Sequence, residues 1–131
     1  MLELITRLLI DLSEQRLTAY ASGPQPIYSA LVSTGLSASP TPTGDFRIAA
    51  KYARTPLTGA DYRTPAVPDV MCLGGGGLGA DRFCIHPAPW QEDRGQCFGV
   101  ARSRGCIRVS RATARWLFAR TAVGTPVRIQ P

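Results

Sequence analysis

The chain has 131 residues, one histidine and four cysteines, and its 15 basic and 9 acidic side chains give a net charge of +6. A hydrophobic share of 44% and a charged share of 18% are those of a globular protein and exclude a disordered chain. The 13 glycines and 11 prolines argue against a helical bundle, and the single histidine excludes a metal site built from several histidines. The length predicts one domain over residues 1–131.

The first part of the chain is predicted to consist of short strands. Residues 4–11 are rich in Leu and Ile, and with the polar turn 12–15 they predict a hairpin whose second strand is 16–20. Further strands are expected at 27–33 and 46–49, separated by a loop of Ser, Pro and Thr.

The middle of the chain is predicted to be free of helix, because three prolines interrupt residues 52–68. Strands are expected at 70–73 and 82–86, on either side of the glycine run 74–79. That run contains a GxGxxG pattern, which needs a following helix to hold a phosphate. A strand is expected there instead, so we interpret the run as a hairpin turn or a loop at the edge of a cleft.

The last part of the chain is predicted to hold the principal helix. Residues 87–102 form a polar loop, and a short strand follows at 107–109. Ser110 is a suitable N-cap for a helix over 111–120, and 126–130 predicts a closing strand. The fold class that results is mostly β, with one principal helix.

The strongest chemical signal surrounds Cys106. This cysteine follows Gly105 and lies between Arg104 and Arg108, whose charges are expected to lower the pKa of the thiol. If Cys106 begins a strand, its side chain and that of Arg108 project from one face. The amides of Gly105 and Cys106 are then candidate donors to an oxyanion.

A nucleophilic cysteine needs a base, and His86 is the only histidine. His86 ends an apolar strand at a proline-rich loop, where functional residues gather. The ordinary alternative makes Cys106 a small buried hydrophobe and His86 a loop residue without a catalytic role. The glycine and polar neighbours of Cys106 favour the catalytic interpretation.

These residues resemble the active-site signature of the L,D-transpeptidase (YkuD) catalytic domain. Residues 103–108, Ser-Arg-Gly-Cys-Ile-Arg, are similar to the family's run of Ser or Thr, His, Gly, Cys, an apolar residue, and Asn or Arg. His86, 20 residues before the cysteine, matches the family's other histidine. Segments 33–35, 41–46 and 124–127 are also similar to the family, so the resemblance covers nearly the whole chain.

The sequence departs from the family pattern in three places. Arg104 replaces the motif histidine, so the role of the base falls on His86 alone. Pro87 stands where a glycine is common. Arg111 begins the predicted helix where acidic residues are usual, a charge that disfavours a helix N-terminus by a few tenths to about 1 kcal/mol.

The resemblance implies an L,D-transpeptidase fold, a β-sandwich or mixed sheet with its principal helix after the catalytic cysteine. It also implies acyl transfer through a thioester. Cys106 would attack the carbonyl between the third residue and D-Ala of a peptidoglycan stem peptide. His86 would take the thiol proton, with a backbone carbonyl near Pro87 orienting the ring. A second stem would give a 3→3 cross-link, and water would give the product of an L,D-carboxypeptidase.

Stem peptides are therefore the expected substrates, and carbapenem-type inhibitors are expected ligands. Arg108 is the first candidate for contact with substrate carboxylates, followed by Ser103 and Arg104. No cofactor or metal is expected. The cysteines are separated by 11, 12 and 8 residues without a Cys-x-x-Cys pair, a poor pattern for zinc.

Two other functions remain open at this point. A domain of the same fold that binds the cell wall or a polyanion without catalysis is kept open by Arg104. A sortase-like transpeptidase, which also pairs Cys, His and Arg, ranks lower because its cysteine motif differs. The neighbouring carboxylates Glu92 and Asp93 are interpreted as a solvated loop rather than a glycosidase pair.

The surroundings in which the protein works are predicted from charge and resemblance together. Glu3, Arg7 and Asp11 interrupt the apolar N-terminal stretch, so neither a membrane span nor a signal peptide is predicted. The family implies the cell envelope or periplasm, whereas the chain as given would stay in the cytoplasm unless a leader had been removed. Dispersed arginines disfavour nucleic-acid binding.

One redox hypothesis concerns Cys84. It lies two residues before His86, so on a strand both side chains would face the same cleft. The favoured interpretation of Cys84 is a buried packing cysteine. The alternative hypothesis is that it forms a disulfide with Cys106 under oxidation and silences the enzyme.

Overall fold

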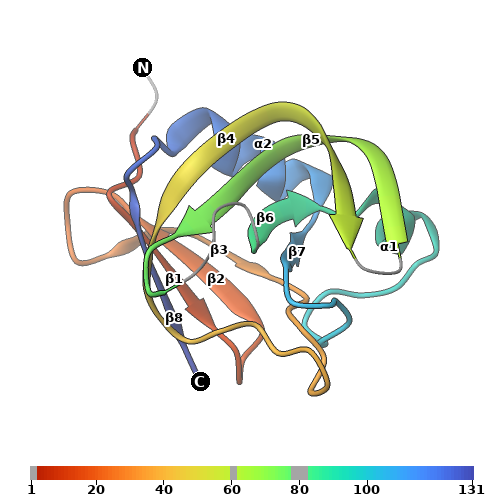
Figure 1. Ribbon diagram of the computed structural model, residues 1–131. Coiled ribbons are helices and arrows are strands. Elements are labelled where there is room, and N and C mark those ends of the chain that lie inside the picture. Colours follow the sequence, from red (N-terminus) through yellow and green to blue (C-terminus); the bar gives the residue numbers. More distant parts are fainter. Residues whose placement is uncertain (1–2, 60–61, 78–82) are drawn as a thin grey trace.

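The computed structural model describes residues 3–59, 62–77 and 83–131. Its elements, in chain order, are β1 (Arg7–Asp11), β2 (Arg16–Tyr20), β3 (Pro26–Leu31), β4 (Gly44–Gly59), β5 (Tyr62–Gly74), β6 (Cys84–Pro87), α1 (Pro89–Asp93), β7 (Ile107–Val109), α2 (Arg111–Arg120) and β8 (Pro126–Gln130). The strands form one mixed sheet in the order β3-β2-β1-β8-β4-β5-β6-β7 (Figure 1). The predicted mostly β fold with one principal helix after Cys106 is confirmed.

The terminal strands lie side by side near the middle of the sheet. β1 pairs antiparallel with β2 and parallel with β8, and β8 pairs antiparallel with the start of β4. Alternate residues of β1 and β8 are buried, among them Leu8, Ile10, Val127 and Ile129. This alternation is what a strand with one face on the core requires.

Helix α2 has the predicted bounds and the predicted cap. The Ser110 hydroxyl accepts a hydrogen bond from the Thr113 backbone amide at 3.1 Å. Leu117 is fully buried, and the helix packs against β5 and β6. The helix therefore covers the strand that carries His86. None of the helices in the described part of the chain has the length and apolarity to cross a membrane.

Strands β4 and β5 are much longer than the short strands expected at 46–49 and 70–73. They form a hairpin that arches past α2 toward α1 (Figure 1). Its outer part contains Pro56, Pro65 and Pro68. Within the described residues, β8 pairs only with the start of β4, and β6 pairs only with the end of β5. In the outer part of the hairpin, β4 and β5 therefore each have one edge without a neighbouring strand. A proline is tolerated at such an edge, because its missing N–H is not needed by a neighbouring strand.

The segment 87–102 is not entirely loop, because it contains the short helix α1. Pro89 occupies the first turn of this helix, where its missing amide has no intrahelical partner to lose. Glu92 and Asp93 lie in α1 rather than in a loop, and Asp93 is solvent-exposed as expected, but both carboxylates contact Arg111. The Glu92 carboxylate accepts the Arg111 backbone amide at 2.7 Å, and Asp93 holds the Arg111 guanidinium at 3.1 Å. The negative charge that the α2 N-terminus lacks in sequence is thus supplied from α1.

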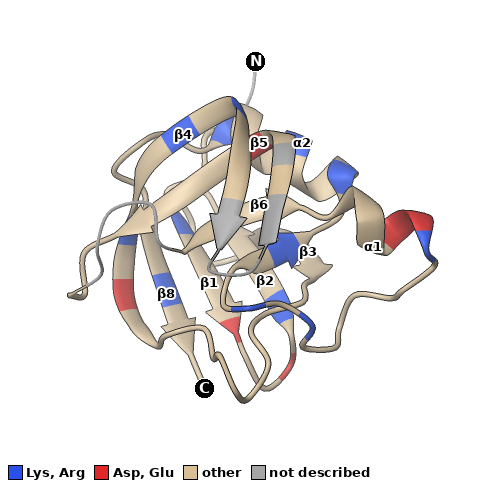
Figure 2. Ribbon diagram, turned by 45° about the vertical axis from the view of Figure 1, so that its right-hand side comes forward, with Lys and Arg blue, Asp and Glu red and all other residues tan. Residues whose placement is uncertain are grey.

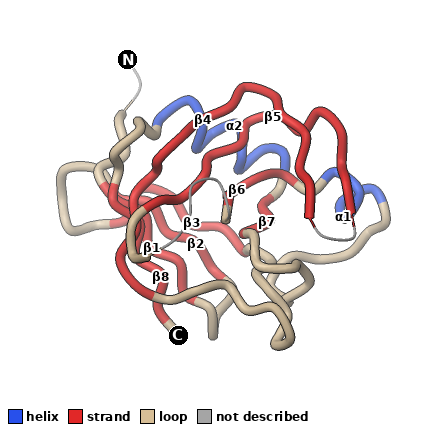
Figure 3. Tube along the Cα trace, in the orientation of Figure 1, coloured by secondary structure: helices blue, strands red, loops and turns tan. Residues whose placement is uncertain are grey.

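The two edges of the sheet meet beside the predicted motif. Ser33, just after β3, forms an antiparallel bridge with Arg108 in β7, and Gly35 forms a parallel bridge with Ser103. The loop that follows β3 and the loop that precedes β7 therefore lie side by side, as Figure 3 shows below β7. Lys and Arg residues are spread over strands, helix and loops rather than gathered on one element (Figure 2).

Candidate active site

Cys106 immediately precedes β7, and the alternation predicted around it is present. Ile107 and Val109 are fully buried, whereas Cys106 and Arg108 are partly exposed. Cys106 and Arg108 therefore project from the same face of the strand, away from the core.

The loop that carries Cys106 is held by buried polar contacts. The Thr41 hydroxyl accepts the Gly35 amide at 2.9 Å and donates to the Gly105 carbonyl at 2.6 Å. The Ser103 hydroxyl accepts the Gly105 amide at 3.1 Å and donates to the Cys106 carbonyl at 2.5 Å. The upstream segments that resemble the family thus serve to fix the cysteine loop. Because the Gly105 amide already donates to Ser103, we retain the Cys106 amide as the candidate oxyanion donor.

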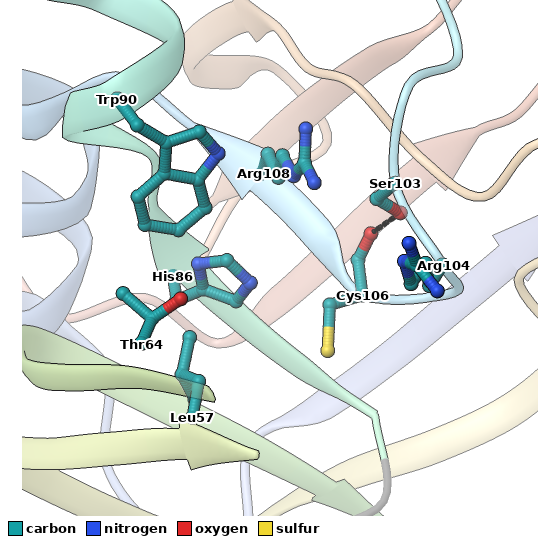
Figure 4. Close-up of a pocket in the computed structure, with 8 residues that line it drawn as sticks. All are labelled: Leu57, Thr64, His86, Trp90, Ser103, Arg104, Cys106 and Arg108. Atoms are coloured by element: carbon teal, nitrogen blue, oxygen red, sulfur yellow. Dashed lines mark hydrogen bonds between the residues drawn. The ribbon is translucent and has the colours of Figure 1, made fainter. Parts of the chain in front are cut away.

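His86 lies on β6 and is 4% exposed. Its Nδ1 lies 2.7 Å from the Pro87 carbonyl oxygen, which can only accept, so Nδ1 carries a proton. In a neutral imidazole Nε2 is then the unprotonated acceptor. Figure 4 shows the ring between Trp90 and Cys106, with one nitrogen on the side of Cys106. The expected orienting carbonyl near Pro87 is confirmed.

Burial sets the protonation of both candidate catalytic groups. It lowers the pKa of His86 to about 4, against the hydrogen bond to Pro87, and the Arg108 charge lowers the pKa further. It also raises the pKa of the Cys106 thiol, while a hydrogen bond from the Cys84 amide and the Arg108 charge act in the opposite direction. The expected lowering of the thiol pKa is therefore wrong, since desolvation outweighs the cationic field. At pH 7 both groups are therefore neutral, an imidazole with an unprotonated Nε2 and a thiol.

A cavity of about 260 Å³ contains these groups (Figure 4). Its lining consists of Leu57, Thr64, His86, Trp90, Ser103, Arg104, Cys106 and Arg108. The predicted nucleophile, base and substrate contacts are thus brought together from β6, β7 and the preceding loop. Among the described residues of this lining the charged ones are the two arginines, which suit a ligand that carries carboxylates. Leu57 and Thr64, from the far end of the hairpin, were not predicted.

The family profile described as the L,D-transpeptidase catalytic domain (YkuD) matches residues 5–129. The chain belongs to this family. No curated protein sequence matches the chain significantly.

Solved L,D-transpeptidases have the same fold. A mutant enzyme from Enterococcus faecium is 26% identical at a TM-score of 0.77, over 96% of this chain and 50% of that one. A carbamoyl enzyme formed with avibactam is 25% identical at 0.81, over 100% and 50% of the two chains. An enzyme from Mycobacterium tuberculosis is 23% identical at 0.78, over 95% and 57%. The chain therefore spans between half and three-fifths of these proteins.

In this L,D-transpeptidase-family domain, Gln91 has a structural role beside the cavity that the sequence did not predict. Its side chain is fully buried and donates to the Ser33 hydroxyl at 3.0 Å and to the Cys97 carbonyl at 3.2 Å. Its carbonyl oxygen accepts from the Arg108 guanidinium at 3.4 Å, and that guanidinium lies 5.5 Å from the centre of the Trp90 ring. Gln91 thus ties the arginine of the cavity to the loop after β3. A lone glutamine in a polar segment gave no signal of this role.

Replacing Gln91 by alanine is expected to destabilise the domain by about 1–3 kcal/mol, because the Ser33 hydroxyl and Cys97 carbonyl lose a buried donor. Urea unfolding measures the change. The exposed Gln96 lies in the same segment, and Gln96→Ala, the matched control, is expected to change the free energy of unfolding by less than about 0.5 kcal/mol. Equal effects of the two substitutions would contradict the assigned role.

The buried imidazole predicts acid sensitivity of the fold. The folded-state pKa of about 4 lies below the ordinary 6.5, so between these values the unfolded chain binds a proton that the native protein does not. Lowering the pH through that window therefore costs about 3 kcal/mol of stability. Urea unfolding of the wild type and His86→Gln at pH 7 and pH 4 is expected to show this extra loss in the wild type alone. The same pH dependence in both proteins would contradict it.

The disulfide predicted between Cys84 and Cys106 is wrong, because Cys84 is bonded to Cys72. The two half-cystines lie opposite each other on β5 and β6, and this pairing depends on the antiparallel register of the two strands, which the sequence does not reveal. Cys97 and Cys106 retain thiols. Among the described residues, no three His, Cys, Asp or Glu side chains gather as a metal site.

Proposed function

We propose that this domain transfers acyl groups between peptidoglycan stem peptides through a thioester on Cys106. The observation that carries the proposal is the cavity shared by the Cys106 thiol and a buried imidazole whose Nε2 is free to accept a proton. The two arginines on its lining suit the carboxylates of a stem peptide. Membership of the family supports the same chemistry.

In the first half of the reaction the Cys106 sulfur attacks the carbonyl carbon that links the third residue to D-Ala. His86 Nε2 takes the thiol proton as the carbon–sulfur bond forms. The Cys106 amide donates to the oxygen that becomes negative. The carbon–nitrogen bond then breaks, the imidazolium returns its proton to the departing amine of D-Ala, and the thioester remains.

In the second half an amine of another stem attacks the thioester carbonyl. His86 accepts a proton from this amine, the carbon–sulfur bond breaks, and the proton returns to the sulfur. The result is a 3→3 cross-link and a regenerated thiol. Water in place of the amine gives a tripeptide, the product of an L,D-carboxypeptidase. Because peptidoglycan is the proposed substrate, the cell envelope is the proposed place of this activity.

Carbapenem-type compounds are proposed inhibitors of this domain. One L,D-transpeptidase of the same fold has been solved in complex with imipenem, and another as a carbamoyl enzyme with avibactam. A β-lactam carbonyl presents the same electrophile to Cys106 as the stem peptide does, and ring opening would leave the inhibitor on the sulfur.

Incubation with a purified disaccharide tetrapeptide tests the proposed reaction. Mass spectrometry is expected to detect a dimer with the mass of two stems less one D-alanine, and Cys106→Ala is expected to yield none. A tripeptide without dimer would assign the carboxypeptidase reaction instead. Saturable binding of the stem with neither product would favour the non-catalytic cell-wall binder, which Arg104 at the motif position keeps open.

A further inference from the structure

The ladder between β6 and β7 ends at the nucleophile. Ile85 and Ile107 form the first described pair of this parallel ladder, which continues to the last residues of both strands. One residue earlier, the Cys84 amide donates to the Cys106 sulfur at 3.4 Å. A backbone N–H is therefore aimed at the atom that the proposed function makes the nucleophile.

The direction of this amide follows from the pairing on the other side of β6. Cys72 and Cys84 are directly opposed in the antiparallel ladder, with Cα atoms 3.9 Å apart. Such close spacing marks a pair that exchanges no ladder hydrogen bonds, and the neighbouring bond runs from the Leu73 amide to the Phe83 carbonyl at 2.8 Å. The Cys84 N–H consequently points away from β5 and toward Cys106.

The disulfide fixes this arrangement from within a buried cluster. Cys72 is 2% and Cys84 3% exposed, and Cys106 packs against the same cluster. The remaining buried members are Val67 and Val70. A covalent bond between the two strands thus lies directly behind the cysteine that faces the cavity.

We propose that the Cys72–Cys84 disulfide is a positioning element for the nucleophile: it holds the Cys84 amide against the Cys106 sulfur and so stabilises the thiolate. This proposal rests on the role of Cys106 in the proposed function. It makes the reactivity of Cys106 dependent on the redox state of a bond in which Cys106 takes no part.

The physical basis is the preference of an N–H donor for a charged acceptor. A thiolate accepts a hydrogen bond more strongly than a thiol does, so the amide favours ionisation. Among the described residues, the other ionisable groups around the sulfur and its cluster are His86 on β6, Arg104 and Arg108 within the motif, and Tyr52 on β4. None of them belongs to the disulfide, and the two groups that reduction releases are neutral as thiols, so breaking the disulfide at neutral pH changes the donor without adding a charge.

Alkylation of Cys106 measures this effect without any acyl transfer. A dithiol reduces the Cys72–Cys84 disulfide of the wild type to two thiols and is itself oxidised to a cyclic disulfide. The reductant is then removed. Iodoacetamide labelling is followed on tryptic peptides, in which Cys106 lies within 105–108 and Cys97 within 95–102. Cys97, an exposed thiol on a separate peptide, is the internal reference.

Reduction is expected to slow labelling of Cys106 at pH 7 by about tenfold, the effect of one unit in the thiol pKa, and to leave the rate at high pH unchanged. Reoxidation restores the rate, Cys72→Ala/Cys84→Ala reproduces the slow profile, and Cys97 is unaffected throughout. An unchanged Cys106 profile after reduction, in protein shown to be folded by circular dichroism, would overturn the proposal. Unfolding of the reduced protein even in the cold, at about 4 °C, would also overturn the proposal, since the disulfide would then support the whole fold.

Because labelling requires no stem peptide, this test is independent of the proposed reaction. A redox-dependent labelling rate without any cross-linked product would retain the positioning role and reject the transpeptidase. A cross-linked product with redox-independent labelling would do the reverse.

Discussion

Acylation of Cys106 by a carbapenem is expected to slow by about 10²- to 10⁴-fold when His86 is replaced by glutamine. Glutamine can donate its amide to the Pro87 carbonyl, but it has no nitrogen that accepts a proton. No acidic side chain of the described residues lines the cavity, so none of these residues offers a carboxylate that could take over as base. The loss should therefore reach the full contribution of a positioned general base.

Stopped-flow or mass-spectrometric acylation rates at several pH values test this prediction. The deficit of His86→Gln is expected to shrink as the pH rises, because hydroxide then forms the thiolate without the imidazole. Cys97→Ala, which removes a thiol outside the cavity, is the control and should acylate at the wild-type rate. A deficit below tenfold at pH 7 would reject His86 as the base.

Substitution of Gly105 by alanine is expected to cost about 1–3 kcal/mol of stability from backbone strain and to displace the nucleophile. Gly105 has a φ of 131°, and a Cβ there would lie 2.6 Å from Cε1 of Phe83. Either the Phe83 ring or the loop has to move, and the loop carries Cys106. Acylation should therefore slow more than the loss of stability alone explains.

Gly124→Ala is the matched control for this prediction. Gly124 also has a positive φ, 97°, but a Cβ at that position meets no atom within 4 Å. It is expected to lose stability through backbone strain while retaining the wild-type acylation rate. Equal acylation rates of folded Gly105→Ala and Gly124→Ala would show that the close approach to Phe83 does not position the cysteine.

Elements with strong local signals were predicted to the residue. The bounds of β2, β7, α2 and β8 follow from alternation, a serine cap and turn residues close by in the sequence. The long hairpin and α1 do not follow from the sequence, because a proline predicts the end of regular structure. In the fold, Pro89 begins a helix and the prolines of the hairpin lie at open strand edges, which are tertiary circumstances.

In the site, too, the features with a local sequence signal were predicted and those that depend on tertiary contacts were not. The candidate nucleophile, base and arginines were predicted from a motif and its spacing, and all of them line one cavity. The sign of the thiol pKa shift was missed because burial cannot be seen from neighbouring charges. Gln91 and the Cys72–Cys84 bond were missed because each depends on contacts between distant segments.

Intact-mass measurement after incubation with imipenem shows whether Cys106 forms a covalent acyl-enzyme. We expect a mass increase equal to one inhibitor, located on tryptic peptide 105–108, and no increase for Cys106→Ala. Folded wild-type protein that remains unmodified, or that carries its adduct on Cys97, would contradict this expectation.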